Sequence, residues 1–338
     1  RRDNNPLDFA HPVDSSFSTF DGQLNEVSWQ SNLYLPEESI LTFGVELEHE
    51  RGDSLFRSTS SFGPFVSRFS EQTATSIGYY FQGQFDLFDI IHLTAGTRHD
   101  HRSRFGGKTT MRVAQAISLP AGFKLRGSVG TGFKAPSLFQ LFSDFGNLAL
   151  KPEETTGYDI GLERSFLDNR VKMDATYFKN DFDELIDFDF LTSTFGNIGK
   201  ADTEGVEVEA QVAPLENLAL GANYTYTDTE NVGTGEELLR RPRNRFSLFV
   251  DYDHAKKFHL RGDLVHTGVR EDMDFSTFPA KRVTLGDYTL VSLAATYKIM
   301  DKLSAYLKIS NLFDENYEEV LGFGTEGFGF MLGLRVGL

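Results

Sequence analysis

Apolar and polar residues alternate one by one along many short segments of this sequence. In one such segment the apolar positions are Leu41, Phe43, Val45 and Leu47, with polar residues or glycine between them. Residues 123–129 and 206–212 follow the same pattern. Successive side chains of a β-strand point to opposite faces, so each segment predicts a strand with one apolar and one polar face. Because this period of two recurs to the end of the chain, an all-β fold is predicted.

The links between these segments differ in length in a regular way. Short turns are expected at residues 36–39, 86–89, 119–122, 167–169, 214–217, 254–257 and 300–302. Long connections are expected between them at residues 51–71, 101–109, 134–154, 191–195, 230–242, 270–286 and 313–326. Strict alternation of short and long links is typical of an outer-membrane barrel, which has tight periplasmic turns and long extracellular loops.

About fifteen antiparallel strands follow from this alternation. In a soluble barrel the apolar face would form a packed core, but a closed sheet of about fifteen strands is too wide for side chains to fill. We therefore expect a transmembrane β-barrel whose charged face lines a wet lumen and whose apolar face meets lipid. The residues expected to face the lumen are Lys124, Arg126, Glu207, Glu209 and Arg335. Those expected to face lipid include Leu125, Val208 and Leu334.

Composition excludes several classes of function. The 33 Lys and Arg against 49 Asp and Glu give a formal net charge of −16, so nucleic acid is not an expected partner. Without cysteine, the chain can form no disulfide, thiolate metal site or cysteine nucleophile. No run of about eighteen apolar residues predicts a transmembrane helix. Barrel strands need only about ten alternating residues each, so this pattern remains compatible with a membrane protein.

Residues 130–154 form the most informative connection in the sequence. The stretch contains Phe133, Lys134, Ala135 and Pro136, then Asn147, then Lys151, Pro152 and Glu153. Together these residues resemble a signature of the TonB-dependent outer-membrane receptors. Two further stretches, residues 195–207 and 311–317, resemble the same family in the same order. Three matches over roughly two hundred residues make the resemblance specific.

The resemblance implies which part of a receptor this chain represents. Family members have an N-terminal plug followed by twenty-two strands, and this sequence matches roughly the last fifteen. We therefore expect residues 1–338 to be a single, partial, C-terminal barrel domain that lacks the plug and the first seven strands. An odd strand count agrees, because bacterial barrels normally close with an even number. Alternatively, residues 7–20 form a sixteenth strand of a smaller barrel.

By resemblance, the function is TonB-dependent uptake of a scarce ligand such as a ferric siderophore or cobalamin. The expected partners are outer-membrane lipid and lipopolysaccharide, a small-molecule chelate, and the TonB complex acting through the plug. The expected location is the outer membrane of a Gram-negative bacterium. No catalytic residue, cofactor or bound metal is expected, so the chain is not predicted to be an enzyme. The alternative function is a passive porin, which needs neither plug nor energy coupling.

Two charged groups could suggest other chemistry. Residues 98–102, with the sequence RHDHR, could form a catalytic or metal cluster, but without a second carboxylate cluster they are expected to be a solvated loop tip. An acidic group could bind calcium; its members are Asp181, Asp183, Glu184, Asp187 and Asp189. These residues lack the fixed spacing and glycine of a calcium loop, so a charged strand end is expected instead.

Overall fold

The computed structural model describes residues 2–4, 15–60, 63–189, 192–197, 199–255, 257–277 and 279–337. Its contacts divide the chain into two compact units. Unit 1 comprises residues 1–115, 128–157 and 181–200, and unit 2 comprises residues 116–127, 158–180 and 201–338. The expectation of a single domain stays a prediction. No helix among the described residues is long and apolar enough to cross a membrane.

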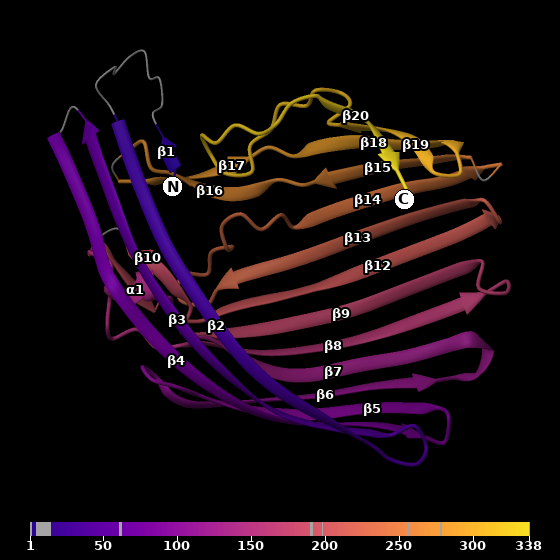
Figure 1. The fold of residues 1–338 in the computed structure, drawn as a ribbon, viewed down its shortest axis with the longest axis horizontal. Helices are drawn as coiled ribbons and strands as arrows, with labels where there is room; N and C mark the ends of the chain where they lie inside the picture. The colour runs from indigo at the N-terminus through magenta and orange to yellow at the C-terminus, as the bar shows by residue number, and fades with distance from the viewer. Residues whose placement is uncertain are drawn as a thin grey trace. The chain divides into compact units, whose positions relative to one another are not determined.

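The described elements are almost entirely β-strands, which follow one another along the sheet in chain order (Figure 1). The strands that lie in unit 1, or begin or end in it, are β1 (Arg2–Asn4), β2 (Ser15–Tyr34), β3 (Ile40–Ser60), β4 (Gly63–Leu87), β5 (Ile91–Arg102), β6 (Gly106–Ser118), β7 (Phe123–Lys134), β8 (Glu153–Phe166), β9 (Val171–Asp183), β10 (Ile186–Asp189) and β11 (Thr194–Asn197). A short helix, α1 (Leu138–Phe142), follows β7.

Unit 2 continues the same antiparallel pattern. Its strands are β12 (Ala201–Leu215), β13 (Leu218–Asn231), β14 (Asn244–His254), β15 (Phe258–Thr267), β16 (Arg270–Asp274), β17 (Lys281–Leu285), β18 (Tyr288–Met300), β19 (Leu303–Ser310) and β20 (Gly329–Val336). A single 3₁₀ turn, η1 (Pro120–Gly122), joins β6 to β7. The hairpins β10–β11 and β16–β17 lie outside the main sheet, within two of the long connections. The all-β prediction is confirmed.

The main sheet contains sixteen strands among the described residues, and without the three-residue β1 it has fifteen, as predicted. The alternative of a sixteenth strand at residues 7–20 is only partly within the described residues. Residues 7–14 lie outside them, whereas Ser15 and its successors belong to β2, which therefore begins earlier than the polar sequence suggests. The short β1 pairs with Ser16, Phe17 and Ser18 of β2.

Two of the seven predicted long connections are wrong. Residues 51–71 were expected to be a loop, but β3 and β4 pair through them from Ile40 opposite Gln84 to Ser60 opposite Gly63. Residues 101–109 hold a tight turn, because β5 extends to Arg102 and β6 starts at Gly106. Polar sequence was misleading here, since hydrogen bonding between antiparallel backbones does not require an apolar face. The other five long connections are present between β7 and β20.

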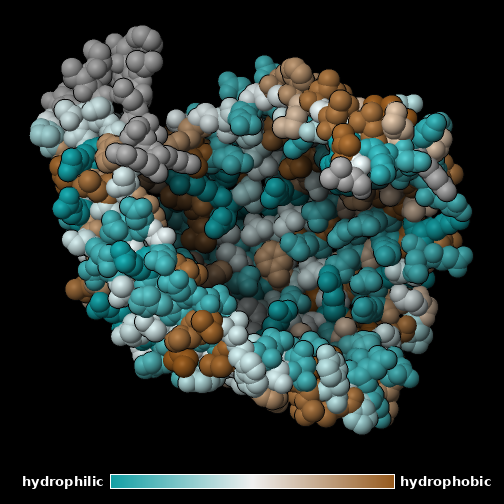
Figure 2. Space-filling model, in the orientation of Figure 1, coloured by the Kyte–Doolittle hydropathy of each residue, from teal (hydrophilic) through white to brown (hydrophobic). Residues whose placement is uncertain are grey.

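Strand register separates an apolar from a polar face in unit 2. Residues directly opposite in neighbouring strands have side chains on one face. One apolar row runs across β13, β14, β18, β19 and β20 through Leu220, Val250, Leu293, Ile309 and Phe330. Hydrophobic side chains are visible over the region of β18–β20 in Figure 2. Phe330, which is 72% exposed, illustrates that this face is not a buried core.

Candidate functional site

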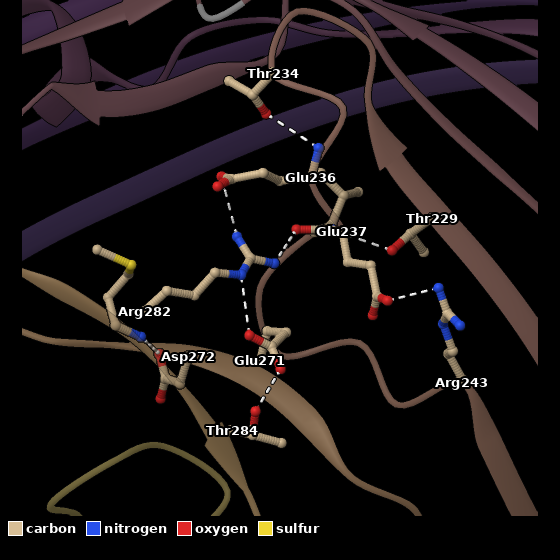
Figure 3. Close-up of polar contacts among 11 residues, drawn as sticks. Thr229, Thr234, Glu236, Glu237, Arg243, Glu271, Asp272, Arg282 and Thr284 are labelled. Carbon is tan, nitrogen blue, oxygen red and sulfur yellow. Dashed lines mark hydrogen bonds and ion pairs between the residues drawn. The ribbon is translucent and has the colours of Figure 1, made fainter.

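Three long connections of unit 2 are joined by polar contacts, and we call them the loop cluster: residues 232–243, 268–287 and 311–328. The second contains the β16–β17 hairpin, with Arg270 paired to Leu285 and Asp274 to Lys281. Figure 3 shows side chains from the first two connections pointing toward one another. The loop cluster is therefore folded structure instead of three independent loops.

Arg282 of β17 links the first two connections. Its Nε donates to Glu271 Oε2 at 3.0 Å, and its Nη2 donates to the Glu237 carbonyl at 2.6 Å (Figure 3). Its Nη1 lies 3.3 Å from Glu236. A second arginine, Arg243, pairs with the Glu237 carboxylate at 2.6 Å. The planar guanidinium suits this role because its donors point in several fixed directions.

Asp272 of β16 is the central buried group of the loop cluster, with 0% exposure. One carboxylate oxygen accepts hydrogen bonds from Arg240 Nε at 2.9 Å and from the Met273 N–H at 2.8 Å. The other accepts from the Leu321 N–H at 2.8 Å, so Asp272 joins all three connections. Burial alone would raise the pKa of the Asp272 carboxyl, but these hydrogen bonds outweigh burial and hold the pKa below its ordinary value.

Arg270 and Tyr288 attach the third connection to the strands beneath it. Arg270, only 4% exposed, donates to the backbone carbonyls of Gly286 and Glu318. The Tyr288 hydroxyl donates to Glu319 at 3.1 Å, and the Tyr288 ring stacks on Tyr317 with centroids 4.2 Å apart. The Arg270 guanidinium also lies 5.2 Å from the centre of the Tyr288 ring, a favourable cation–π distance.

A cavity of about 570 Å³ lies beside the loop cluster within unit 2. This volume is within the range of about 300–1,000 Å³ found for small-molecule sites. Part of its lining is one cross-strand row that spans β12, β13, β14, β15 and β18: Glu207, Thr225, Arg245, Thr267 and Tyr288. The remaining lining residues are Thr227, Arg240, Arg241, Pro242, Arg270, Glu319 and Val320.

The signature loop in unit 1 has a different construction. Pro136 is fully buried, and Ser137 caps α1 by accepting a hydrogen bond from the Gln140 N–H at 3.2 Å. The Asn147 side chain donates to the Phe195 carbonyl at 2.9 Å. The Asn197 side chain in turn accepts from the Lys151 N–H at 3.0 Å. Two stretches that resemble the receptor family, about fifty residues apart in sequence, are thus bonded to each other.

We call this arrangement of residues 133–153 with β10 and β11 the clasp. Lys151 Nζ pairs with Glu184 at 2.7 Å, and Glu153 accepts a hydrogen bond from the Ile186 N–H at 3.1 Å. Lys134, at the start of the signature, pairs with Glu153 at 3.2 Å. Aromatic rings in successive contact add to the clasp: Phe65, Phe145, Phe188, Phe195, Phe139 and Phe69. Family resemblance identified the position of this loop, but not its partner.

The structure places the predicted lumen-facing residues as follows. Glu207 lines the 570 Å³ cavity. Arg126 and Glu209 line a second, smaller cavity of about 240 Å³ in unit 2, where Arg126 pairs with Asp174 at 2.5 Å. Lys124 is half-buried, and Arg335 is exposed on β20. Of the residues predicted to face lipid, Val208 is 39% and Leu334 67% exposed, and Leu125 is half-buried. Which face meets lipid stays a prediction.

The RHDHR segment is not the solvated loop tip that was expected, because it lies within β5. Asp100 is 7% exposed and accepts from Arg98 at 2.9 Å. Arg98 also pairs with Glu46 at 2.7 Å, and Arg102 pairs with Glu50 at 2.6 Å. Because alternate residues of a strand share one face, Arg98 and Arg102 of β5 form a row of ion pairs with Glu46 and Glu50 of β3.

The acidic group that could have suggested calcium is divided among separate partners. Asp183 pairs with Lys200 at 2.9 Å, and Asp187 accepts from the Phe188 N–H at 2.7 Å. Among the described residues the group closest to a metal-ligand arrangement is another one, Asp251, Asp253 and His259, with ligand atoms within 4.8 Å. Sequence analysis missed this group because it arises from cross-strand pairing of β14 with β15.

Several siderophore receptors of known structure share the fold of this chain. The ferripyoverdine receptor of the outer membrane of Pseudomonas aeruginosa gives a TM-score of 0.74 at 20% identity, over 96% of this chain and 49% of that one. A mutant of the ferric enterobactin receptor PfeA from Pseudomonas aeruginosa, in complex with enterobactin, gives 0.76 at 20% identity, over 94% and 54%. The siderophore receptor PirA from Acinetobacter baumannii gives 0.75 at 18% identity, over 94% and 55%.

The chain thus spans about half the length of these receptors. A family model described as the β-barrel of TonB-dependent receptor-like proteins matches residues 2–312, nearly the whole chain. Proteins of this family lie in the outer membrane of Gram-negative bacteria and are receptors, not enzymes, so both of these expectations are confirmed. The chain therefore belongs to the TonB-dependent receptor family, through its β-barrel domain.

Proposed function

We propose that this protein captures a scarce metal chelate at the outer membrane and imports it with energy supplied through TonB. The expected ligand is a ferric siderophore or, alternatively, a cobalamin. The observation that carries the proposal is the 570 Å³ cavity beside a loop cluster that is tied together by Asp272 and Arg282. Loops held in one conformation lose little entropy when a ligand binds, so they suit high affinity.

The arrangement supports binding and gating chemistry. The cavity lining consists mainly of arginine, threonine and glutamate, which can hydrogen-bond a polar chelate. Ligand release then requires a conformational change, and TonB would supply the work for it through the plug. Lipid and lipopolysaccharide would surround the apolar face that contains Val208 and Leu334. In a passive porin, by contrast, loops joined by hydrogen bonds and ion pairs beside a cavity would restrict diffusion of solutes through the channel.

Uptake by whole cells tests this function. Cells that lack the receptor gene are compared with complemented cells for uptake of ferric siderophores and of cobalamin, with TonB present and with TonB deleted. We expect complementation to restore uptake of one ligand at nanomolar concentration, and TonB deletion to abolish it. Uptake that persists without TonB and rises linearly with ligand concentration would support the porin instead.

A further inference from the structure

We infer that the cavity beside the loop cluster recognises an anionic chelate through Arg241 and Arg245, which bind its carboxylate or catecholate oxygens. This inference rests on the proposed function, because it assigns a ligand class to the same receptor. The juxtaposition of two exposed guanidiniums at one cavity carries it. The inference selects an anionic siderophore from the siderophores and cobalamins that the fold alone leaves as candidates.

The charge of the cavity is opposite to that of the chain. The chain has a formal net charge of −16. The cavity lining, however, contains four arginines, Arg240, Arg241, Arg245 and Arg270, against two carboxylates, Glu207 and Glu319. A concave site lined by one sign of charge concentrates the field and raises the local concentration of an oppositely charged ligand. In a strongly acidic protein, a basic cavity therefore selects for an anion.

The four arginines are not equivalent, since two are already engaged. Arg240 bonds the buried Asp272, and Arg270 donates to two backbone carbonyls. Within the described part of the chain, the side chains of Arg241 and Arg245 form no hydrogen bond or ion pair, and both residues are exposed. A guanidinium carries five N–H donors, so these two residues offer donors that no protein group uses.

Both free arginines start from positions that the structure fixes. Arg245 lies on β14 between Thr225 of β13 and Thr267 of β15, so its backbone is paired on both sides. Arg241 follows Arg240, whose side chain is held by Asp272 and whose N–H donates to the Glu271 carbonyl at 2.7 Å. Proline at position 242 restricts the chain after Arg241. Because both backbones are already fixed, ligand binding has to order only the side-chain rotations, which lowers the entropy cost of binding.

The geometry of guanidinium favours particular ligand groups. Its planar fork matches pairs of adjacent oxygens, such as those of a carboxylate, in two parallel hydrogen bonds. Catecholate presents two adjacent oxygens in a similar way. A neutral hydroxamate chelate has no net charge, and neither has a cobalamin, whose periphery is mostly amides with one phosphodiester. Either ligand therefore offers the arginines less negative charge in exchange for their lost hydration. The cavity therefore favours an anionic chelate.

Binding of two iron chelates, one anionic and one neutral, to the full-length receptor tests this inference. The probes are an anionic ferric tricatecholate and a neutral ferric trihydroxamate of similar size, with affinities measured by tryptophan fluorescence quenching. We expect the wild type to prefer the anionic probe, and this preference to weaken as salt rises. Arg241→Gln and Arg245→Gln should each weaken binding of the anionic probe about tenfold or more, because each removes charge-assisted hydrogen bonds.

Arg335→Gln is the matched control, because it removes an exposed arginine of unit 2 that does not line the cavity. It should leave both affinities unchanged, and so should either cavity variant for the neutral probe. Equal loss of both probes in Arg241→Gln and Arg245→Gln would indicate a structural role and overturn the inference. So would a wild type that binds the neutral probe as tightly, or neither probe. TonB-dependent uptake of the neutral probe or of cobalamin would overturn the ligand class while preserving the proposed function.

Discussion

The clasp of unit 1 and the loop cluster of unit 2 both join long connections, but through different interactions. Each holds long connections against one another at the ends of strands. The clasp uses backbone hydrogen bonds to Asn147 and Asn197 together with a row of phenylalanine rings. The loop cluster uses charged groups, with Asp272 and Arg282 each serving several partners.

This difference separates what a family signature marks from where the ligand chemistry lies. The signature residues of the clasp are occupied by the protein itself: Pro136 is buried, and Lys151 and Glu153 are paired. The cavity lined by Arg241 and Arg245 has no comparable motif in the sequence. A recognisable motif therefore identifies the scaffold that the family shares, whereas the groups that contact a particular ligand vary.

Asp272→Ala should have the largest effect. It removes a buried carboxylate that pairs with Arg240, and it leaves the Met273 and Leu321 N–H groups without their acceptor. We expect the loop cluster to lose local stability of about 1–3 kcal/mol for each of the two N–H groups left unpaired. Hydrogen exchange of residues 311–328 and limited proteolysis should both accelerate, while the exchange of the clasp stays unchanged.

Asp287→Asn is the control for this variant, because it changes an exposed aspartate of the same connection. Little effect is expected on exchange or proteolysis. If Asp272→Ala leaves residues 311–328 as protected as in the wild type, the charged groups do not hold the loop cluster together, and the comparison fails.

Val208→Arg should have the next largest effect, by blocking assembly of the barrel. Val208 is expected to meet lipid, where an arginine near the midplane costs about 2–4 kcal/mol. Glu207→Gln is the paired control, because Glu207 lines the cavity and a glutamine keeps a polar side chain there. The fraction of heat-modifiable receptor in outer-membrane preparations measures assembly. Equal amounts of both variants would contradict the assignment of faces.

Asn197→Ala tests the clasp. The Asn197 side chain donates to the carbonyls of Lys151 and Glu184 and accepts from the Lys151 N–H. Removal leaves the partly buried Glu184 carbonyl unpaired, at a cost of about 1–3 kcal/mol. We expect faster hydrogen exchange in residues 147–151 and 194–197, with the loop cluster unaffected. Asn25→Ala on the exposed part of β2 should change neither region.

Acidification should loosen the loop cluster. The pKa of Asp272 is lower in the folded protein than its ordinary value of about 3.9. The charged carboxylate therefore stabilises the fold above that value, and this contribution is lost as the pH falls through the lower folded pKa. The protection factor of the Leu321 amide, corrected for intrinsic exchange, should fall below pH 4 in the wild type. An Asp272→Asn variant should not show this transition.

The fold could be predicted because β-barrel sequences repeat one simple pattern. Alternation at Leu41 to Leu47 and at Val206 to Val212 follows directly from strand geometry. The tight turn at Glu37 and Glu38, both with positive φ, was visible as a polar break. The polar sequence of residues 51–71 wrongly predicted a loop, because β3 and β4 continue to pair there without an apolar face.

The candidate site could not be predicted because it depends on which connections meet. Nothing in the sequence near Asp272 indicates that Arg240 and Leu321 are its partners. Glu207 was identified by alternation alone, but Arg245, which lies two strands away beyond Thr225, enters the same row only through strand register. Register is set by the whole sheet, so a local pattern cannot supply it.

Lys134→Ala should have the smallest effect, although Lys134 belongs to the signature. Its side chain is 68% exposed and pairs with Glu153 at 3.2 Å. An ion pair with an exposed lysine contributes about 0–1 kcal/mol, since the ammonium group remains hydrated and salt screens it. Glu153→Ala should cost more, because Glu153 is largely buried and also accepts the Ile186 N–H. A double-mutant cycle read by hydrogen exchange of residues 186–189 separates the two contributions. A coupling energy well above 1 kcal/mol would mean that charge also holds the clasp, and the contrast with the loop cluster would narrow accordingly.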